Sequence, residues 1–360
     1  MSKNKIKLFD PSFDVREKNA LFKAMESRYW ASGSGEGLVK KFEKNFTDYI
    51  QTKSCVATNN GTSALHLALS LFNIKNREVI LPSLSFVSTA HSVLYNGGKP
   101  VFVDVDPKTL CIDPKQIEEK INEKTIAILP VHFGGMPCDL DKIMKICKIH
   151  GINLIEDAAH AVGTTYRNKK IGTHGDAVCF SFHPVKNLAM PTGGAITINK
   201  NSKKYEKILK IKRWCGISNR KGSKYDVVEL GWNFYMNEFS AAIGIEQLKK
   251  IPKMNGKRKN IAKRYHDEIK IPHKMMLNND CSYHIFWLQV DKRDEFIKHM
   301  NKNGIETGIH YKPIHEMKFY SNQIELPNTE STGKRIISIP IHANMTQDDV
   351  EKVIKYCNNF

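Results

Sequence analysis

Short apolar segments alternate with amphipathic helical segments from about residue 53 to residue 250. Such alternation is typical of βαβ units, in which helices connect parallel strands. Continuous apolar runs, such as Ile126–His132, indicate strands that are buried on both faces of the sheet. The predicted strands are Cys55–Thr58, Glu78–Pro82, Pro100–Val103, Ile126–His132, Asn153–Asp157, Ala177–Phe182 and Gly194–Ile198. The predicted helices between them are Ser63–Leu71, Ser88–Tyr95, Asp113–Lys120 and Leu140–His150.

The pattern changes after about residue 250. It predicts a Lys-rich helix over Ile251–Ile269, a strand over Ile285–Val290 with Trp287 in the core, and helices over Arg293–Asn303 and Gln347–Tyr356. We therefore expect an α/β protein with two parts. A large domain, residues 1–250, holds a mostly parallel sheet flanked by helices, and a small α+β domain comprises residues 251–360.

Composition narrows the class of protein. The 360 residues include 55 Lys and Arg against 37 Asp and Glu, a formal net charge of +18, and 41% are hydrophobic. The apolar content excludes a mainly disordered chain. The basic excess leaves three interpretations: a solvated Lys-rich surface, a nucleic-acid-binding face, or a cleft for an anionic small molecule. Lys is scattered between apolar residues, which favours the first.

The eight cysteines form no CxxC pair, and several, such as Cys179, lie in apolar runs. They are typical of reduced cysteines that serve as small buried hydrophobes. The first residues lack the apolar segment of a signal peptide, and no apolar run approaches the roughly 20 residues that span a bilayer. We therefore expect a cytoplasmic protein without a membrane partner.

Two candidate catalytic residues follow predicted strands. Asp157 ends the strand Asn153–Asp157, and Lys186 comes shortly after Ala177–Phe182. Chemistry in such sheets collects at the carboxyl ends of the strands. A lysine beside apolar strand residues is partly desolvated, which lowers its pKa and makes the amine nucleophilic.

A third feature, Asn59–Ser63, follows the first predicted strand and opens a helix. A helix N-terminus binds anions, and Gly61 allows the backbone to approach one closely. Taken alone, Ser63 is better explained as a helix N-cap. Together with a strand-end aspartate and a later lysine, the segment predicts a site for pyridoxal 5'-phosphate (PLP).

Through these and further motifs, the chain resembles the DegT/DnrJ/StrS family of PLP-dependent sugar aminotransferases. The resemblance covers nearly the whole chain and rests on several long motifs in the same order. They are Asn60–Leu65, Pro82–Phe86, Glu156–Gly163, Phe180–Asn187, Gly193–Ile196, Gly231–Glu238, Ile309–His315 and Ile337–His342. It implies a fold-type-I PLP-dependent transferase.

The resemblance also implies roles for the matching residues. Lys186 would carry the cofactor and move the proton, and Asp157 would pair with the pyridine nitrogen. The remaining roles are the following: Gly61, Thr62, Ser63 and Ser181 at the cofactor phosphate, Phe86 on the ring, His160 by the ring oxygen, Asn233 at the cofactor of a neighbouring subunit, and His310 and Tyr311 by the sugar.

Two positions depart from the family pattern. Tyr235 stands where relatives often have Arg, so an anion contact is missing or replaced. Arg213 is followed by Trp-Cys-Gly where relatives often show Arg-x-His-Gly. A diphosphate or carboxylate contact and a surface role both remain open for Arg213.

The implied reaction moves an amino group from L-glutamate to a keto-sugar, with PLP cycling through pyridoxamine phosphate in ping-pong order. The substrate would be a 4-keto- or 3-keto-deoxysugar linked to UDP, dTDP or GDP, used in amino-sugar or polysaccharide biosynthesis. One branch of the family replaces the lysine with His and dehydrates sugars, so Lys186 favours transamination. The resemblance implies a homodimer with shared active sites. Alternatives are a PLP-binding regulatory protein, an aminotransferase of an amino-cyclitol ketone and, last, a nucleic-acid-binding protein.

Other polar residues are expected to be structural. Adjacent strand residues face opposite sides of a sheet, so Glu156 is not expected to share the site of Asp157. Four histidines show no metal-binding spacing with nearby cysteines, and we predict no metal site. These are His91, His132, His174 and His315.

Overall fold

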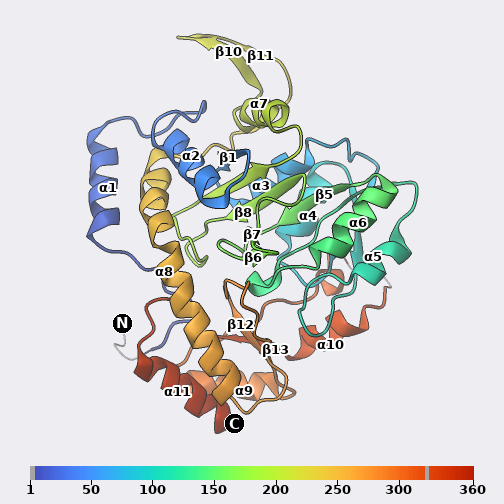
Figure 1. The fold of residues 1–360 in the computed structure, drawn as a ribbon, viewed down its shortest axis with the longest axis vertical. Helices are drawn as coiled ribbons and strands as arrows, with labels where there is room; N and C mark the ends of the chain where they lie inside the picture. Colours follow the sequence, from blue (N-terminus) through green and yellow to red (C-terminus); the bar gives the residue numbers. More distant parts are fainter. Residues whose placement is uncertain (1–4, 321–323) are drawn as a thin grey trace.

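The computed structural model describes residues 5–320 and 324–360. A seven-stranded sheet lies at its centre, in the order β1-β9-β8-β5-β4-β2-β3 (Figure 1). The strands are β1 Ser54–Thr58, β2 Glu78–Pro82, β3 Lys99–Val103, β4 Thr125–Ile128, β5 Asn153–Asp157, β8 Ala177–Ser181 and β9 Gly194–Ile198. Strand β9 runs antiparallel to β1 and β8, and the other pairings are parallel. The predicted mostly parallel sheet is confirmed.

Each predicted strand of the sheet is present, and the predicted ends agree within one residue except at the end of β4. Strand β4 ends at Ile128 and not at His132. Pro130 has no backbone N–H to donate to a ladder, so regular pairing stops before it. An isolated bridge between Val131 and Asp157 continues the contact between the two chain segments beyond the strand.

Helices cover both faces of the sheet. One face is covered by α3 Gly61–Leu69, α4 Ser88–Tyr95 and α7 Ser202–Arg213, and the other by α2 Leu38–Ile50, α5 Pro114–Lys120, α6 Leu140–His150 and part of α8. Alternate strand residues feed the two cores. On β2, Val79 and Leu81 pack on the α3 side and Ile80 packs on the α2 side. The same period of two places the two acids of β5, Glu156 and Asp157, on opposite faces of the sheet.

Helix α8, Glu238–Glu268, is much longer than predicted and runs from the sheet to the C-terminal elements (Figure 1). The predicted start at Ile251 is wrong, because the helix begins at Glu238, where the Asn237 side chain caps it by accepting the Ser240 N–H. The predicted division at residue 250 falls within this helix and stays a prediction. The other C-terminal elements, beside the lower half of α8 in Figure 1, are α9 Arg293–Lys302, α10 Pro327–Arg335, α11 Gln347–Asn358 and the antiparallel pair β12 Phe286–Gln289 and β13 Ile336–Ile339. Trp287 is buried on β12, as predicted.

Several elements were not predicted. Helix α1, Val15–Glu26, begins with a capping box formed by Asp14 and Glu17, and packs against α8. A hairpin of β10 Ile217–Lys221 and β11 Lys224–Val227 projects past α7 at the top of Figure 1. A second short hairpin pairs β6 Thr165–Tyr166 with β7 Lys169–Lys170. Single turns of 3-10 helix occur at Phe133–Gly135 and Ile314–Glu316.

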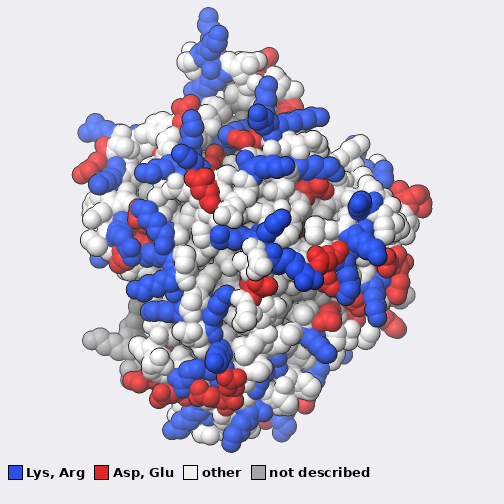
Figure 2. All heavy atoms as spheres, viewed as in Figure 1, with Lys and Arg blue, Asp and Glu red and all other residues white. Residues whose placement is uncertain are grey.

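Charge and cysteine placement follow the expectations from composition. On the face drawn in Figure 2, Lys and Arg are spread over the whole surface with Asp and Glu among them. This distribution is typical of a solvated surface and not of a single basic face. All eight cysteines are unpaired, and every one except Cys215 is buried. None of the helices in the described part of the chain is both long and apolar enough to cross a membrane.

Candidate active site

A cavity of about 350 Å³ lies where β1, β2, β5 and β8 end. Its position at the carboxyl ends of strands is where open α/β sheets bind their ligands. Nine of the predicted site residues line it: Gly61, Thr62, Phe86, Asp157, His160, Ser181, Lys186, His310 and Tyr311. Larger hollows lie elsewhere on the surface, but this one gathers the predicted chemistry.

The N-terminus of α3 forms one wall of the cavity. The Asn60 side chain caps this helix by accepting the backbone N–H of Ser63 at 2.8 Å. Gly61 and Thr62 form the first turn of this helix and line the cavity. A Cβ atom on Gly61 would lie 2.7 Å from Cβ of Ser181, so only glycine allows this approach. The wall combines a helix N-terminus with the hydroxyl groups of Thr62 and Ser181, which makes it a favourable place for a phosphate.

Asp157 lies at the end of β5 and is 5% exposed. Its carboxylate accepts hydrogen bonds from the Thr89 hydroxyl at 2.9 Å and from the Ala159 backbone N–H at 3.1 Å. Burial raises its pKa, against the lowering effect of these two bonds and of the Lys186 charge. Across the described residues, no cationic side chain lies within ion-pair distance of it. A buried acid in this state is costly unless a ligand supplies the missing cation.

Lys186 follows β8 and its side chain enters the same cavity. Burial of the amine lowers its pKa to about 8, and the negative charge of Asp157 only partly opposes this. About one tenth of the amine is therefore unprotonated at pH 7, and about half at pH 8. Proton transfer is most efficient for a group with a pKa close to the working pH.

Three neutral polar groups form the opposite wall. The His160 ring accepts the Gly134 N–H at Nδ1, at 3.2 Å, so its Nε2–H donates to the Tyr311 hydroxyl at 3.1 Å. Nδ1 of His310 lies 3.0 Å from the Ser338 hydroxyl. Burial, followed by the Lys186 charge, lowers the pKa of His160 well below its usual value and that of His310 to about 4. The wall therefore offers hydrogen bonds without charge.

Phe86 covers the mouth of the cavity. The loop after β2 holds its ring 57% exposed, 6.0 Å from the ring of Tyr311. A large exposed aromatic ring beside the cavity provides a flat face for a planar ligand. Its position agrees with the predicted stacking role, which stays a prediction.

Three predicted site residues lie outside the cavity. Ser63 is buried in α3, and the N-cap role considered for it belongs to Asn60. Asn233 is exposed and pairs its backbone with Trp214. Its predicted contact with a neighbouring subunit stays a prediction.

Arg213 is the clearest departure. It is fully buried, and its guanidinium donates to Glu43 Oε1 at 2.6 Å and to the Ala57 and Ser34 carbonyl oxygens. Neither a substrate contact nor a surface role fits this position. The side chain joins α7 to α2 and β1, which makes it a structural ion pair.

Sequence reasoning missed several residues that line or adjoin the cavity. Ser85, Ser88 and Thr89 follow β2, so the rule that ligands bind at strand ends could have found them. Phe9 and His284 come from distant segments and gave no local signal. Nε2 of His284 lies 3.5 Å from Nζ of Lys186.

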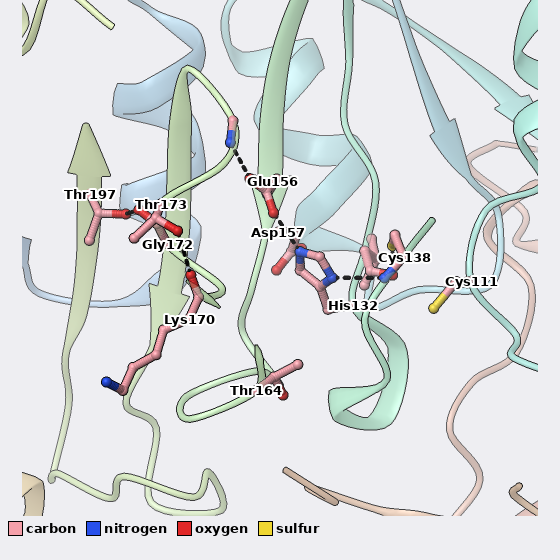
Figure 3. Close-up of polar contacts among 12 residues, drawn as sticks. Cys111, His132, Cys138, Glu156, Asp157, Thr164, Lys170, Gly172, Thr173 and Thr197 are labelled. Atoms are coloured by element: carbon pink, nitrogen blue, oxygen red, sulfur yellow. Dashed lines mark hydrogen bonds and ion pairs between the residues drawn. The ribbon is translucent and has the colours of Figure 1, made fainter. Parts of the chain in front are cut away.

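Glu156 faces away from the cavity, as expected, and Figure 3 shows its surroundings. It accepts hydrogen bonds from His132 Nε2 at 2.7 Å and from the Gly175 N–H. Nδ1 of His132 accepts the Cys138 N–H at 3.1 Å, so the proton of a neutral ring lies on Nε2. This side of β5 is a closed, satisfied polar network.

The other histidines considered are also engaged structurally. His315 lies 2.7 Å from the Ser83 hydroxyl and near Glu330, His91 packs among aromatic rings, and His174 packs on Tyr166. Searching residues 5–320 and 324–360 finds no cluster of three His, Cys, Asp or Glu side chains that could hold a metal ion.

At the strand ends of this α/β sheet lie a lysine with a lowered pKa and a buried aspartate that has no ion-pair partner among the described residues, an arrangement suited to cofactor-dependent group transfer. The sequence model of the DegT/DnrJ/EryC1/StrS aminotransferase family matches residues 11–358. The chain therefore belongs to this family and is an aminotransferase.

Curated and structural relatives agree with this assignment. GDP-perosamine synthase of Caulobacter vibrioides is 34% identical over 368 residues, covering 97% of this chain and 96% of the relative. The structure of Helicobacter pylori PseC, an aminotransferase involved in pseudoaminic acid biosynthesis, matches with a TM-score of 0.93 at 28% identity, covering 99% of this chain and 98% of that one. Spr1654 of Streptococcus pneumoniae, assigned as a sugar aminotransferase, matches in its PMP form with a TM-score of 0.93 at 25% identity, covering 99% and 97%. Spr1654 also has a structure in a PLP form.

Proposed function

We propose that the protein transfers the amino group of L-glutamate to a keto-sugar by a PLP-dependent ping-pong reaction. The substrate class is a 4-keto- or 3-keto-deoxysugar linked to UDP, dTDP or GDP. The observation that carries the proposal is that a lysine with a lowered pKa and a buried acid without an ion-pair partner face one cavity.

The residues of the cavity fit the cofactor. Asp157 would hold a protonated ring nitrogen, because a cation there supplies the charge that the buried carboxylate lacks. The α3 N-terminus with Thr62 and Ser181 would hold the phosphate, and Phe86 would cover the ring. Bound PLP would supply an electron sink that takes the amino group from the donor and passes it on as pyridoxamine phosphate.

Lys186 is the residue that moves the proton in this proposal. Its amine would take the proton from the donor carbon and return it at the cofactor side, then act in reverse for the keto-sugar. A pKa of about 8 suits both directions, because the neutral and charged forms are close in free energy near neutral pH. Burial by the cavity walls keeps bulk water from competing for that proton.

The neutral wall supports a sugar as the acceptor. His160, His310 and Tyr311 offer hydrogen-bonding groups without charge, which suits the hydroxyl and carbonyl oxygens of a sugar ring. The names of GDP-perosamine synthase and PseC favour a nucleotide-linked sugar in amino-sugar biosynthesis. The exposed position of Asn233 is compatible with a homodimer in which each chain contributes to its partner's site.

The test is the half-reaction without any sugar. Protein loaded with PLP should lose its yellow colour on addition of L-glutamate, and a keto-sugar should restore it. A panel of UDP-, dTDP- and GDP-linked 4-keto and 3-keto sugars, with an inosose as the cyclitol candidate, would identify the acceptor.

Variants of two lysines control this test. Lys186→Ala should bind PLP only non-covalently and should not bleach, whereas Lys169→Ala, at an exposed position on β7, should behave as wild type. Full bleaching by Lys186→Ala would overturn the proposal. A wild-type protein that is yellow but unchanged by L-glutamate would favour the regulatory alternative instead.

A further inference from the structure

We propose that His284 is a positioning residue that donates a hydrogen bond from Nε2–H to the unprotonated amine of Lys186. The inference rests on the proposed function, in which this amine reacts. Nε2 of His284 lies 3.5 Å from Nζ of Lys186, at the outer limit of hydrogen-bond distance. The histidine comes from the segment just before β12, far from the lysine in the sequence.

The segment that carries His284 is tied to the lysine and to the cavity. Asn187, the residue after Lys186, donates its side-chain amide to the Ser282 carbonyl oxygen at 3.0 Å. The Ser282 hydroxyl lies 3.2 Å from the His160 carbonyl oxygen, and the His284 N–H donates to the Gly134 carbonyl oxygen at 2.9 Å. These bonds fix the position of the His284 imidazole relative to the Lys186 amine as well as relative to its own segment.

The His284 ring is held in a dry place. It is 2% exposed and stacks on Phe9, with ring centroids 5.5 Å apart and an interplanar angle of 16°. The His160 ring lies on another side, with centroids 4.4 Å apart. Burial, followed by the nearby charge of Lys186, holds the pKa of His284 well below its usual value, so the ring is neutral.

The tautomer follows from the other ring nitrogen. Nδ1 of His284 is buried and has no hydrogen-bond partner among the described residues. A buried N–H without an acceptor is rarer in proteins than a buried acceptor without a donor. The single proton of the neutral ring therefore lies on Nε2, which faces Lys186.

A hydrogen-bond donor at Nε2 of His284 favours one protonation state of Lys186. Only the unprotonated amine has a lone pair to accept the bond, so the contact stabilises the neutral form of Lys186. It adds to the effect of burial and opposes the attraction of Asp157 for the charged form. His284 keeps its proton throughout. Its role is to orient the lone pair of the Lys186 amine and to keep that amine unprotonated and reactive.

The first test measures how readily Lys186 captures an aldehyde, without any turnover. Protein without added cofactor is mixed with PLP at a series of pH values, and the C=N bond that forms with loss of water is reduced by borohydride. Peptide mass spectrometry then counts the modification at Lys186. In His284→Gln the side-chain amide nitrogen is as many bonds from Cβ as Nε2 is in histidine, so an N–H donor is kept at that reach. In His284→Asn the amide nitrogen is only as many bonds from Cβ as Nδ1. His174→Asn, outside the cavity and also with an unpartnered Nδ1, is the matched control.

The expected midpoint of capture is close to pH 8 for wild type, His284→Gln and His174→Asn. For His284→Asn the midpoint should rise by about one unit, so that capture at pH 7 falls about tenfold. An unchanged midpoint in His284→Asn, or an equal shift in His284→Gln, would overturn the role of His284. Failure of wild type to capture at Lys186 would instead overturn the proposed function, so the two failures are distinguishable.

A second test reads the tautomer in the unaltered protein. Nitrogen-15 NMR of histidine-labelled protein distinguishes protonated from bare ring nitrogens, and the His284 signals are those missing from His284→Gln. A proton on Nε2 is expected at about pH 9, where most of the Lys186 amine is unprotonated. A proton on Nδ1 would contradict the proposal, whatever the stability of the variants.

Discussion

Two neighbouring carboxylates on β5, Glu156 and Asp157, are both buried and have opposite surroundings. Glu156 is fully satisfied by His132 and the Gly175 N–H, within a closed network (Figure 3). Asp157 has two neutral donors and an open cavity in front of it. One acid builds the structure, and the other is left incomplete for a ligand. The missing counter-charge, more than burial itself, marks the functional residue.

The largest expected effect comes from Asp157→Asn. Its amide cannot stabilise a cationic ring nitrogen, so turnover with PLP should fall about a thousandfold. The free energy of unfolding without cofactor should not fall, because a buried carboxylate without a counter-ion is itself costly. Bleaching rates and urea midpoints measure the two quantities. More than a tenth of wild-type activity in this variant would contradict the assignment.

The opposite result is expected for Glu156→Ala. This change leaves the His132 Nε2–H and the Gly175 N–H without an acceptor, and should lower the free energy of unfolding by about 3–5 kcal/mol. Activity per folded molecule should stay within about threefold of wild type. Urea unfolding and active-site-normalised rates test this, with Glu156→Gln as the milder control. A loss of activity equal to that of Asp157→Asn would remove the distinction between the two acids.

A smaller effect is expected at the phosphate wall. In Gly61→Ala the new Cβ would lie 2.7 Å from Cβ of Ser181, which forces the two segments apart. The affinity for PLP, measured by titration of the apoprotein, should fall about tenfold, equivalent to about 1.4 kcal/mol. Gly256→Ala in α8, where no atom lies within 4 Å, is the control. It should keep wild-type affinity and gain up to about 1 kcal/mol of stability.

The smallest expected effect concerns the hydrogen bond from Thr89 to Asp157, which influences the pKa of this acid. The Thr89 hydroxyl lowers the pKa of Asp157, so Thr89→Val should raise it further. The carboxylate then becomes protonated at a higher pH, and the acid limb of the pH–rate profile should move up by about one unit. Thr89→Ser keeps the hydroxyl and should keep the wild-type profile. Identical profiles for Thr89→Val and wild type would show that this bond does not hold the charge.

Much of the site was predictable because it lies at strand ends. The apolar runs located β5 and β8, and the polar residues just after them faced one edge of the sheet, as the parallel pairing requires. The N-terminus of α3 followed from the same logic, although the cap proved to be Asn60 and not Ser63. These features depend on residues only a few positions apart.

Arg213 shows where such reasoning stops. Its neighbours in the sequence suggested an anion contact, but its carboxylate partner, Glu43, lies 170 residues away in the chain. A cation on a helix gives no local sign of which acid it will meet. The length of α8 was also missed, because the predicted helix began at Ile251 and the helix begins at Glu238.

The alternation of apolar strand segments with helical segments thus decided the sheet and the edge that bears the site. The period of two in a strand decided that Glu156 and Asp157 face opposite sides of the sheet. Only the tertiary structure decided that Arg213 is structural, that Phe9 and His284 close around Lys186, and that Asp157 has no counter-ion among the described residues. Burial and the absence of a partner arise from segments that meet only in the folded chain, and they set the pKa of the amine.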